Sequence, residues 1–199
     1  IGNPPYVDSE NMIKSQPIIR EFINHKFLSA KGNWDLYIPF HEQAIKILKT
    51  NGIKSFITPN KWLSIAYANE LRLLYINLLY KICNCTDIKV FDAGVSPVIS
   101  FFKKCDTFSF SVDTVNSNFE FNTSCILSSK EIDETSLGIL LSNYSSILLK
   151  IKKIKNRFRD FITCENPFST SEAYKLCDII IDKIKPNQKF FKLINTGTI

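Results

Sequence analysis

The stretch WDLYIPFHEQAIKILKTNGIKSFITP, residues 34–59, decides the fold that this sequence predicts. In its first part, apolar side chains recur at the spacing of an amphipathic helix from Trp34 to Lys49, at Tyr37, Phe40, Ala44, Ile45 and Leu48. Asn51-Gly52 ends this helix, and Ile53 to Thr58 is typical of a short buried strand. A helix that leads through a tight stop into a buried strand indicates an α/β fold.

The flanking segments extend the same alternation. A helix is predicted from Pro17 onward, because proline is favoured in a first turn, and another from about Lys61 to Ile82. Two short strands, Asp87 to Phe91 and Val98 to Phe102, are joined by the turn Asp92-Ala93-Gly94 and predict a closing hairpin. This order is typical of a doubly wound α/β sheet.

After residue 103 the composition shifts to Ser, Thr and Asn, which indicates a boundary. Helices are predicted from about Lys130 to Phe161, with Ser128 or Ser129 as N-cap, and from Glu172 to Ile184. A strand follows from Lys189 to Ile194. We therefore divide the chain into a first domain, 1–103, a linker and helical region, 104–185, and the start of a further domain, 186–199.

The composition limits the class of protein. A hydrophobic content of 45% and a charged content of 22% are ordinary for a globular chain. The formal charge of +6 favours a polyanionic partner, although solubility alone explains it equally well. The sequence contains no apolar run long enough to span a membrane, and it does not begin with the basic and then apolar leader of a secreted protein. We therefore expect a cytoplasmic protein with no membrane contact. Because Ile1 is not a methionine, we also expect a piece of a longer polypeptide.

The cysteines and histidines give no sign of a metal site or a catalytic nucleophile. The six cysteines match neither a zinc-binding pattern nor a disulfide framework. His25 and His41 have no cysteine or histidine at ligand spacing. We therefore predict reduced thiols and no bound metal.

The tetrapeptide Asn3-Pro4-Pro5-Tyr6 carries the clearest chemical signal. Asn3 offers a side-chain oxygen and Pro4 a backbone carbonyl, and the consecutive prolines stiffen the loop before any ligand arrives. Two such acceptors can hold the two N–H bonds of an amino group on an aromatic ring and favour the geometry in which its lone pair is free to react. Tyr6 adds a ring on which a base can stack.

A base inside a duplex reaches such a loop only after it is rotated out, which costs a few kcal/mol. Stacking on one aromatic ring returns about 1–3 kcal/mol, so a second ring is expected on the other face, and Phe91 is the candidate. Two alternatives stay open: the tetrapeptide can be an ordinary extended linker, and Phe91 can be a core residue.

The tetrapeptide resembles motif IV of amino-methylating DNA methyltransferases. Residues 31–40 are similar to motif V of that family, residues 52–63 to the strand, turn and helix that follow, and residues 90–99 to its terminal hairpin. The order resembles the gamma class of adenine-specific enzymes of type II restriction–modification systems, from motif IV onward. The resemblance implies the C-terminal half of a Rossmann-like sheet, followed by a mainly helical extension that leads to a target-recognition domain.

For the site, the resemblance implies that Asn3, Pro4 and Pro5 form the catalytic loop, that Tyr6 and Phe91 sandwich the adenine, and that Phe40 lies against S-adenosylmethionine. Phe40 fits a core position equally well. The glycine-rich cofactor motif of the family has no counterpart here, so we expect the isolated chain to be inactive.

The expected partners are double-stranded DNA and, across an uncovered sheet edge, a second copy or a missing N-terminal half. A nuclease fused to the same polypeptide is compatible with the resemblance. The competing hypotheses are a methyltransferase for protein glutamine or RNA, and a non-catalytic DNA-binding or assembly module.

Overall fold

The computed structural model describes residues 1–91, 94–105, 107, 109–128, 137–154, 156 and 160–161. Contacts divide the chain into two units, Ile1–Lys153 and Ile154–Ile199. The described helices and strands belong to the first unit. The predicted helix at Glu172–Ile184, the predicted strand at Lys189–Ile194 and the segment 186–199 lie outside the described residues.

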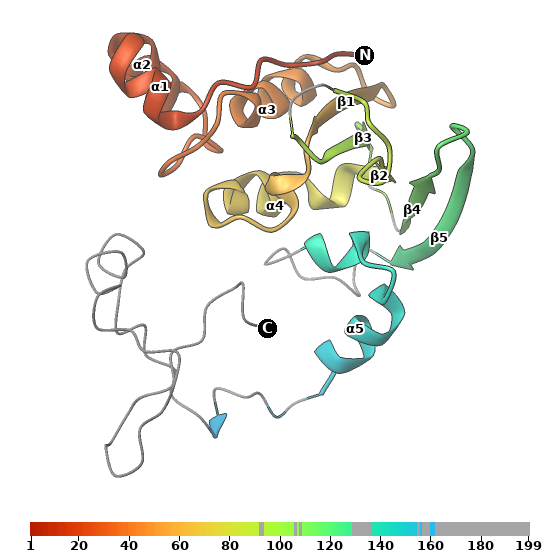
Figure 1. Ribbon diagram of the computed structural model, residues 1–199. Coiled ribbons are helices and arrows are strands. Elements are labelled where there is room, and N and C mark those ends of the chain that lie inside the picture. The colour runs from red at the N-terminus through yellow and green to blue at the C-terminus, as the bar shows by residue number, and fades with distance from the viewer. Residues whose placement is uncertain are drawn as a thin grey trace, which may run out of the picture. The chain divides into compact units, whose positions relative to one another are not determined.

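One mixed sheet organises the first unit. Its strands are β1 (Ile53–Pro59), β2 (Leu79–Asn84), β3 (Pro97–Lys103), β4 (Ser109–Val115) and β5 (Phe121–Ser128), in the spatial order β1-β3-β2-β4-β5. β3 is antiparallel to both β1 and β2, β2 is parallel to β4, and β4 is antiparallel to β5. Figure 1 shows α3 beside β1 and the β4–β5 hairpin at the other end of the sheet. The predicted α/β class is confirmed.

Three helices precede the sheet: α1 (Ser9–Ser15), α2 (Pro17–Lys26) and α3 (Tyr37–Ile47). The carboxylate of Asp8 caps α1, because its Oδ1 accepts a hydrogen bond of 2.8 Å from the backbone N–H of Asn11. Pro17 occupies the first turn of α2, as predicted. The predicted helix at Trp34–Lys49 and strand at Ile53–Thr58 are confirmed as α3 and β1, although α3 begins three residues later.

The stop between α3 and β1 depends on a left-handed residue, Asn51, with φ of 61°. A left-handed conformation costs most L-residues about 1–2 kcal/mol, whereas asparagine and glycine adopt it readily. We expect Asn51→Ala to lower the free energy of unfolding by about 1 kcal/mol and Asn51→Gly to change it much less. Urea denaturation of the two variants checks this, and equal losses would contradict it.

The helix predicted from Lys61 to Ile82 is wrong in most of its length. The segment forms 3₁₀ turns η1 (Asn60–Leu63), η2 (Ala66–Ala68) and η3 (Ile76–Leu78), the short helix α4 (Asn69–Tyr75), and then strand β2. The buried guanidinium of Arg72 donates to the carbonyls of Trp62 at 2.6 Å and Ile65 at 3.0 Å. These carbonyls are therefore satisfied without a continuous helix, and the apolar end of the segment pairs with β3.

The closing hairpin exists, but its first strand was predicted at the wrong place. β3 covers Val98–Phe102 as expected, whereas its hairpin partner is β2 and not Asp87–Phe91. Both edges of β3 are already occupied, by β1 and β2. No backbone edge of β3 is left for a third strand to pair with, and Asp87–Phe91 therefore remains outside the sheet.

Beyond residue 103 the sheet continues, where the sequence predicted a linker and a helical region. β4 and β5 form a hairpin whose first strand joins β2. The long helix predicted from Lys130 to Phe161 is confirmed only at the helix α5 (Ser145–Lys152). It is wrong as a continuous element, because the turn η5 (Gly138–Leu141) and residues 142–144 precede α5. Ser128 ends β5, and the residues 129–136 that follow it lie outside the described part of the chain.

The core between α3 and the sheet contains two buried basic side chains. The amine of Lys54 on β1 lies 2.5 Å from Nδ1 of His41 on α3, and both residues are buried. The same amine lies 4.0 Å from the ring centroid of Phe102 and 4.6 Å from that of Phe56. Burial lowers the pKa of Lys54 well below its ordinary value, and burial together with Lys54 does the same for His41.

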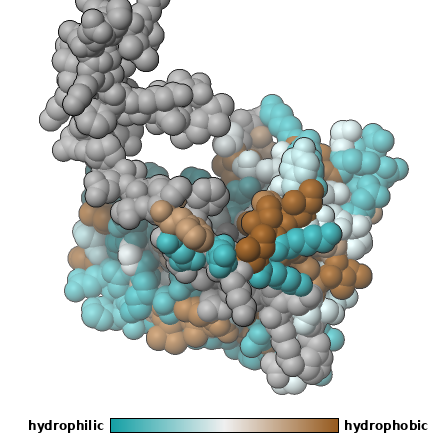
Figure 2. Space-filling view, turned by 90° about the horizontal axis from the view of Figure 1, so that it is seen from below, coloured by the Kyte–Doolittle hydropathy of each residue, from teal (hydrophilic) through white to brown (hydrophobic). Residues whose placement is uncertain are grey.

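Apolar side chains also reach the surface. On the face in Figure 2 apolar and hydrophilic side chains lie side by side, and Ile1, Ile18, Ile47 and Ile126 are among the most exposed apolar residues in the described part of the chain. No helix there is long and apolar enough to cross a membrane.

Candidate functional site

The edge of β1 positions the tetrapeptide. The backbone N–H of Gly2 donates to the carbonyl of Ser55 at 2.9 Å, and the N–H of Ile57 donates to the carbonyl of Gly2 at 3.2 Å. This single parallel bridge brings Gly2 against the ring of Phe56, where an added Cβ would lie 2.8 Å from Cε1. Glycine is therefore required for the close approach, and the next four residues leave the sheet at the C-terminal end of β1.

The Asn3–Tyr6 loop is anchored to β1 on one side and to the start of α3 on the other. Pro4 is buried, whereas Asn3 and Pro5 are exposed. The hydroxyl of Tyr6 donates to the carbonyl of Ile57 at 2.9 Å. Just beyond, the N–H of Leu36 donates to the carbonyl of Val7 at 2.8 Å, which ties the loop to the start of α3. The loop is thus fixed between β1 and α3, with Asn3 at the surface.

The ring of Tyr6 lies between two other aromatic rings. Its centroid is 6.2 Å from that of Tyr37 and 6.0 Å from that of Phe91, and both contacts are edge to face. The structure therefore brings Tyr6 and the predicted second aromatic together across 85 residues of sequence. A base stacked between two parallel rings needs about 7 Å between them. The sandwich stays a prediction, and it requires the Phe91 ring to turn.

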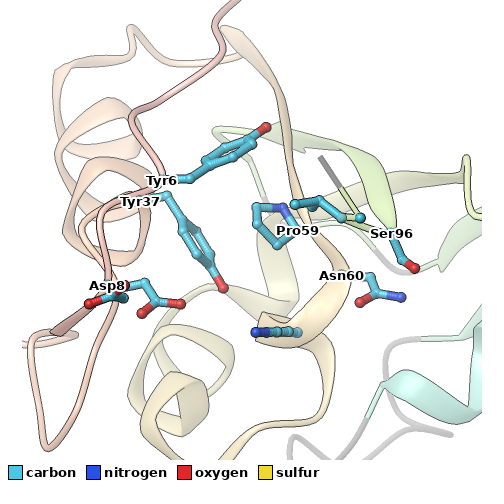
Figure 3. A pocket seen from close by; sticks show the side chains of 10 residues that line it. Tyr6, Asp8, Tyr37, Pro59, Asn60 and Ser96 are labelled. Carbon is cyan, nitrogen blue, oxygen red and sulfur yellow. The ribbon is translucent and has the colours of Figure 1, made fainter. Parts of the chain in front are cut away.

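A cavity of about 280 Å³ opens beside Tyr6. Tyr6, Asp8, Asp35 and Tyr37 form one wall, and the segments 59–61 and 94–96 form the rest. In Figure 3 the hydroxyl of Tyr37 points toward the centre of these side chains, and Asn60 and Ser96 lie across from it. The volume lies just below the usual range of small-molecule pockets, about 300–1,000 Å³, and suits a ligand of modest size such as a nucleobase.

Tyr6 and Tyr37 line the cavity, and the hydroxyl of Tyr67 lies next to that of Tyr37. The hydroxyl of Tyr67 donates to the Asp35 carboxylate at 2.5 Å. Burial, followed by the neighbouring Tyr67 hydroxyl, raises the pKa of Tyr37 far above its ordinary value, and burial with Asp35 raises the pKa of Tyr67. Burial also raises the pKa of Tyr6. All three hydroxyls therefore keep their protons at neutral pH and can donate hydrogen bonds.

Phe40 is separate from this cavity. It is 42% exposed on α3 and is not among the residues that line the cavity. The alternative that Phe40 is a core residue is therefore wrong, and its contact with the cofactor stays a prediction. Among the described residues no group of three or more His, Cys, Asp or Glu side chains could hold a metal ion.

Sequence reasoning missed several cavity residues. Asp35, Tyr37 and Asn60 lie inside the stretches that carried the resemblance, but no role was assigned to them. Ser96 also lies inside such a stretch, residues 90–99, without an assigned role, and Asp8 lies outside all of them. The position of Asp8, two residues after Tyr6, was the one feature that could have found it.

The chain is similar to known proteins over its first half. Residues 1–91 match the model of a family described as Eco57I restriction-modification methylase. The chain is 33% identical over 72 residues to the type II restriction enzyme and methyltransferase RM.Eco57I of Escherichia coli. This alignment covers 36% of the chain and 7% of the relative, so the chain spans a small part of that protein's length.

Two solved structures show more distant similarity. The type IIG restriction endonuclease BpuSI is 17% identical, with a TM-score of 0.42 over 50% of this chain and 13% of that one. The type IIL restriction-modification enzyme MmeI, solved in complex with DNA, is 19% identical, with a TM-score of 0.44 over 61% and 17%. The predicted resemblance to restriction-modification methyltransferases is confirmed by the family match.

Proposed function

From the match of residues 1–91 to the Eco57I restriction-modification methylase family, we propose that the chain is part of a DNA methyltransferase that modifies the exocyclic amino group of an extruded adenine. The observation that carries this proposal is the Asn3–Tyr6 loop, which is anchored on β1 and α3 and lies beside a cavity of about 280 Å³.

The loop performs three tasks in this proposal. The side-chain oxygen of Asn3 and the backbone carbonyl of Pro4 accept the two N–H bonds of the amino group and orient its lone pair. Pro5 keeps Pro4 extended. The ring of Tyr6 stacks on one face of the base, and Phe91 turns to cover the other. S-adenosylmethionine, when bound, supplies an electrophilic methyl group.

This chain offers only part of a binding site for S-adenosylmethionine. Phe40 offers an exposed ring on α3 and would lie against the cofactor. The glycines at 2, 32, 52, 94, 138 and 197 form no G-x-G turn, so the principal binding motif must come from elsewhere. We therefore propose that the 199-residue chain alone transfers no methyl group. The edge of β1 next to Gly2 is where a missing N-terminal half or a second copy would pair.

The proposed parent protein is a restriction–modification enzyme, with double-stranded DNA as its partner and the bacterial cytoplasm as its location. The net charge of +6 suits a phosphate backbone. We propose residues 1–103 as the catalytic part, whose sheet continues through β4 and β5 into the segment 104–185, and 186–199 as the entry to target recognition. A nuclease on the same polypeptide is compatible with this function.

The proposal is tested by the destination of a labelled methyl group. The complete polypeptide that carries this chain is incubated with double-stranded DNA and methyl-labelled S-adenosylmethionine, and the DNA is then digested to nucleosides. We expect the label on the amino group of adenine, and no transfer by the isolated chain. Label on cytosine would refute adenine specificity. Transfer to RNA or to glutamine in protein, with none to DNA, would favour the competing methyltransferases.

A further inference from the structure

The charged residues of the cavity are divided between its two walls. The wall that carries Tyr6 contributes the carboxylates of Asp8 and Asp35. The second wall, formed by the segments 59–61 and 94–96, contributes Lys61, which is the one cation among the described residues that line the cavity. The two walls therefore offer different chemistry to a ligand.

The carboxylates are engaged within the chain, whereas the lysine is not. Asp8 accepts hydrogen bonds from the backbone N–H and the side-chain amide of Asn11, at 2.8 and 2.9 Å. Asp35 accepts one from the hydroxyl of Tyr67 at 2.5 Å. Lys61 is exposed and forms no ion pair with any described residue. Its positive charge is therefore available to an anionic ligand.

Two further donors lie on the same wall as Lys61. The backbone N–H of Asn60 donates to the carbonyl of Ser96 at 2.9 Å, directly beside the last pair of the β1–β3 ladder. Figure 3 shows both side chains across the cavity from the ring of Tyr37, and neither forms a hydrogen bond within the described part of the chain. An added Cβ at Gly94 would meet no atom within 4 Å, so the backbone that leads to Ser96 is bordered by open space.

This arrangement suits the two ends of an extruded nucleotide. Its base is uncharged and stacks on Tyr6, whereas the phosphates that flank it are anions. A phosphate beside Asp8 and Asp35 would be repelled by like charge. Beside Lys61 it meets an ammonium group, and amide and hydroxyl donors are also common partners of DNA phosphates.

We propose that Asn60, Lys61 and Ser96 form a binding site for a backbone phosphate next to the extruded nucleotide. This inference rests on the proposed function, and it adds a contact with the DNA strand to the contacts of the Asn3–Tyr6 loop with the base. Lys61 supplies the charge, and Asn60 and Ser96 supply hydrogen bonds. Holding the phosphate on this wall positions the base against Tyr6 on the other.

The first test measures how DNA affinity depends on salt, in the complete polypeptide and with a duplex that it methylates. Lys61→Met should weaken binding about 10-fold and reduce the slope of log affinity against log salt by about 1, because one phosphate contact is lost. Ser96→Ala should weaken binding about 3- to 10-fold with the slope unchanged, because it removes a donor and no charge.

Lys49→Met is the matched control. Lys49 is also exposed, but it precedes the first residue of β1 while Lys61 follows the last, so the seven-residue strand lies between them. This length corresponds to about 20 Å. We expect Lys49→Met to keep both the affinity and the slope of the unchanged protein.

The second test locates the phosphate. The duplex carries an uncharged methylphosphonate in place of either phosphate that flanks the target adenine. For the unchanged protein, one of the two replacements should weaken binding about 10-fold. Lys61→Met should bind that duplex and natural DNA equally, since the charge that the phosphate contacts is already gone.

The outcomes separate the two proposals. If methyl groups reach adenine but Lys61→Met keeps the salt slope, or still discriminates against the same methylphosphonate, the inference fails and the proposed function stands. Weaker binding of S-adenosylmethionine by Lys61→Met, with DNA binding unchanged, would assign the lysine to the cofactor's carboxylate and also overturn the inference. If no methyl group reaches adenine in the unchanged protein, the proposed function fails.

Discussion

Asn3→Ala is expected to lower methyl transfer by the complete polypeptide about 10²- to 10³-fold. The side-chain oxygen of Asn3 is one of two acceptors that orient the amino group, and its loss leaves Pro4 alone to hold a nitrogen that is a poor nucleophile. Since Asn3 is exposed and the loop is anchored through Gly2, Tyr6 and Val7, the substitution should not disturb the fold. DNA affinity should stay nearly the same, because contacts with phosphates supply most of it.

Single-turnover methylation and DNA binding, measured on the same preparations, check this expectation. Asn3→Asp should retain more activity than Asn3→Ala, since a carboxylate also accepts hydrogen bonds. Asn118→Ala, in an exposed turn between β4 and β5, is the matched control and should be fully active. Loss of DNA affinity with methylation unchanged would instead support a binding or assembly module.

Lys54→Met is expected to raise the free energy of unfolding by about 1–4 kcal/mol at pH 7. The Lys54 amine is buried between α3 and β1, among the rings of Phe56 and Phe102, and no carboxylate of the described residues forms a salt bridge with it. Burial holds its pKa well below the ordinary value of 10.5, so folding of the unchanged chain must remove a proton or bury a charge. Methionine fills a similar volume without that penalty.

The effect has a defined pH dependence. Between the depressed pKa of the folded chain and 10.5, the unfolded chain binds the proton on Lys54 and the folded chain does not, so stability rises with pH. The advantage of Lys54→Met should therefore shrink as the pH approaches 10.5. His41 acts in the same direction at acid pH: its depressed pKa makes stability fall as the pH drops below 6.5, because the unfolded chain then takes up a proton.

Urea denaturation at several pH values measures the difference between the two chains. The tyrosines and cysteines with raised pKa values affect both chains equally and cancel in the difference. Lys49→Met, at an exposed position with the same chemical change, should leave the stability nearly unaltered. A Lys54→Met chain that is less stable than the unchanged one at pH 7 would show that the contact with His41 outweighs the burial of the amine.

The local sequence pattern predicted secondary structure correctly where the interactions that determine it join residues close in sequence. The helix spacing of residues 34–49 and the stop at Asn51-Gly52 predicted α3 and β1, because the caps and dihedral angles involved are properties of neighbouring residues. The apolar run from Lys61 to Ile82 contains no glycine or proline, so local pattern predicted one helix. In the structure Arg72 donates to the carbonyl of Trp62, and Leu79–Asn84 pairs with the edge of β3 to form β2 in place of a helix. Both are contacts that the local sequence pattern does not predict.

By itself, the sequence determined the chemistry of the loop: the acceptors of Asn3 and Pro4, the stiffness of two prolines and the ring of Tyr6 follow from residue type and order. Only the tertiary structure decided what surrounds that loop. Backbone hydrogen bonds to Ser55 and Leu36 bring β1 and the start of α3 against it, and thereby create the cavity and the buried hydroxyl of Tyr37. The physical reason is that such a cavity depends on contacts between segments far apart in the chain, whose pairing is selected by the packing of the whole sheet.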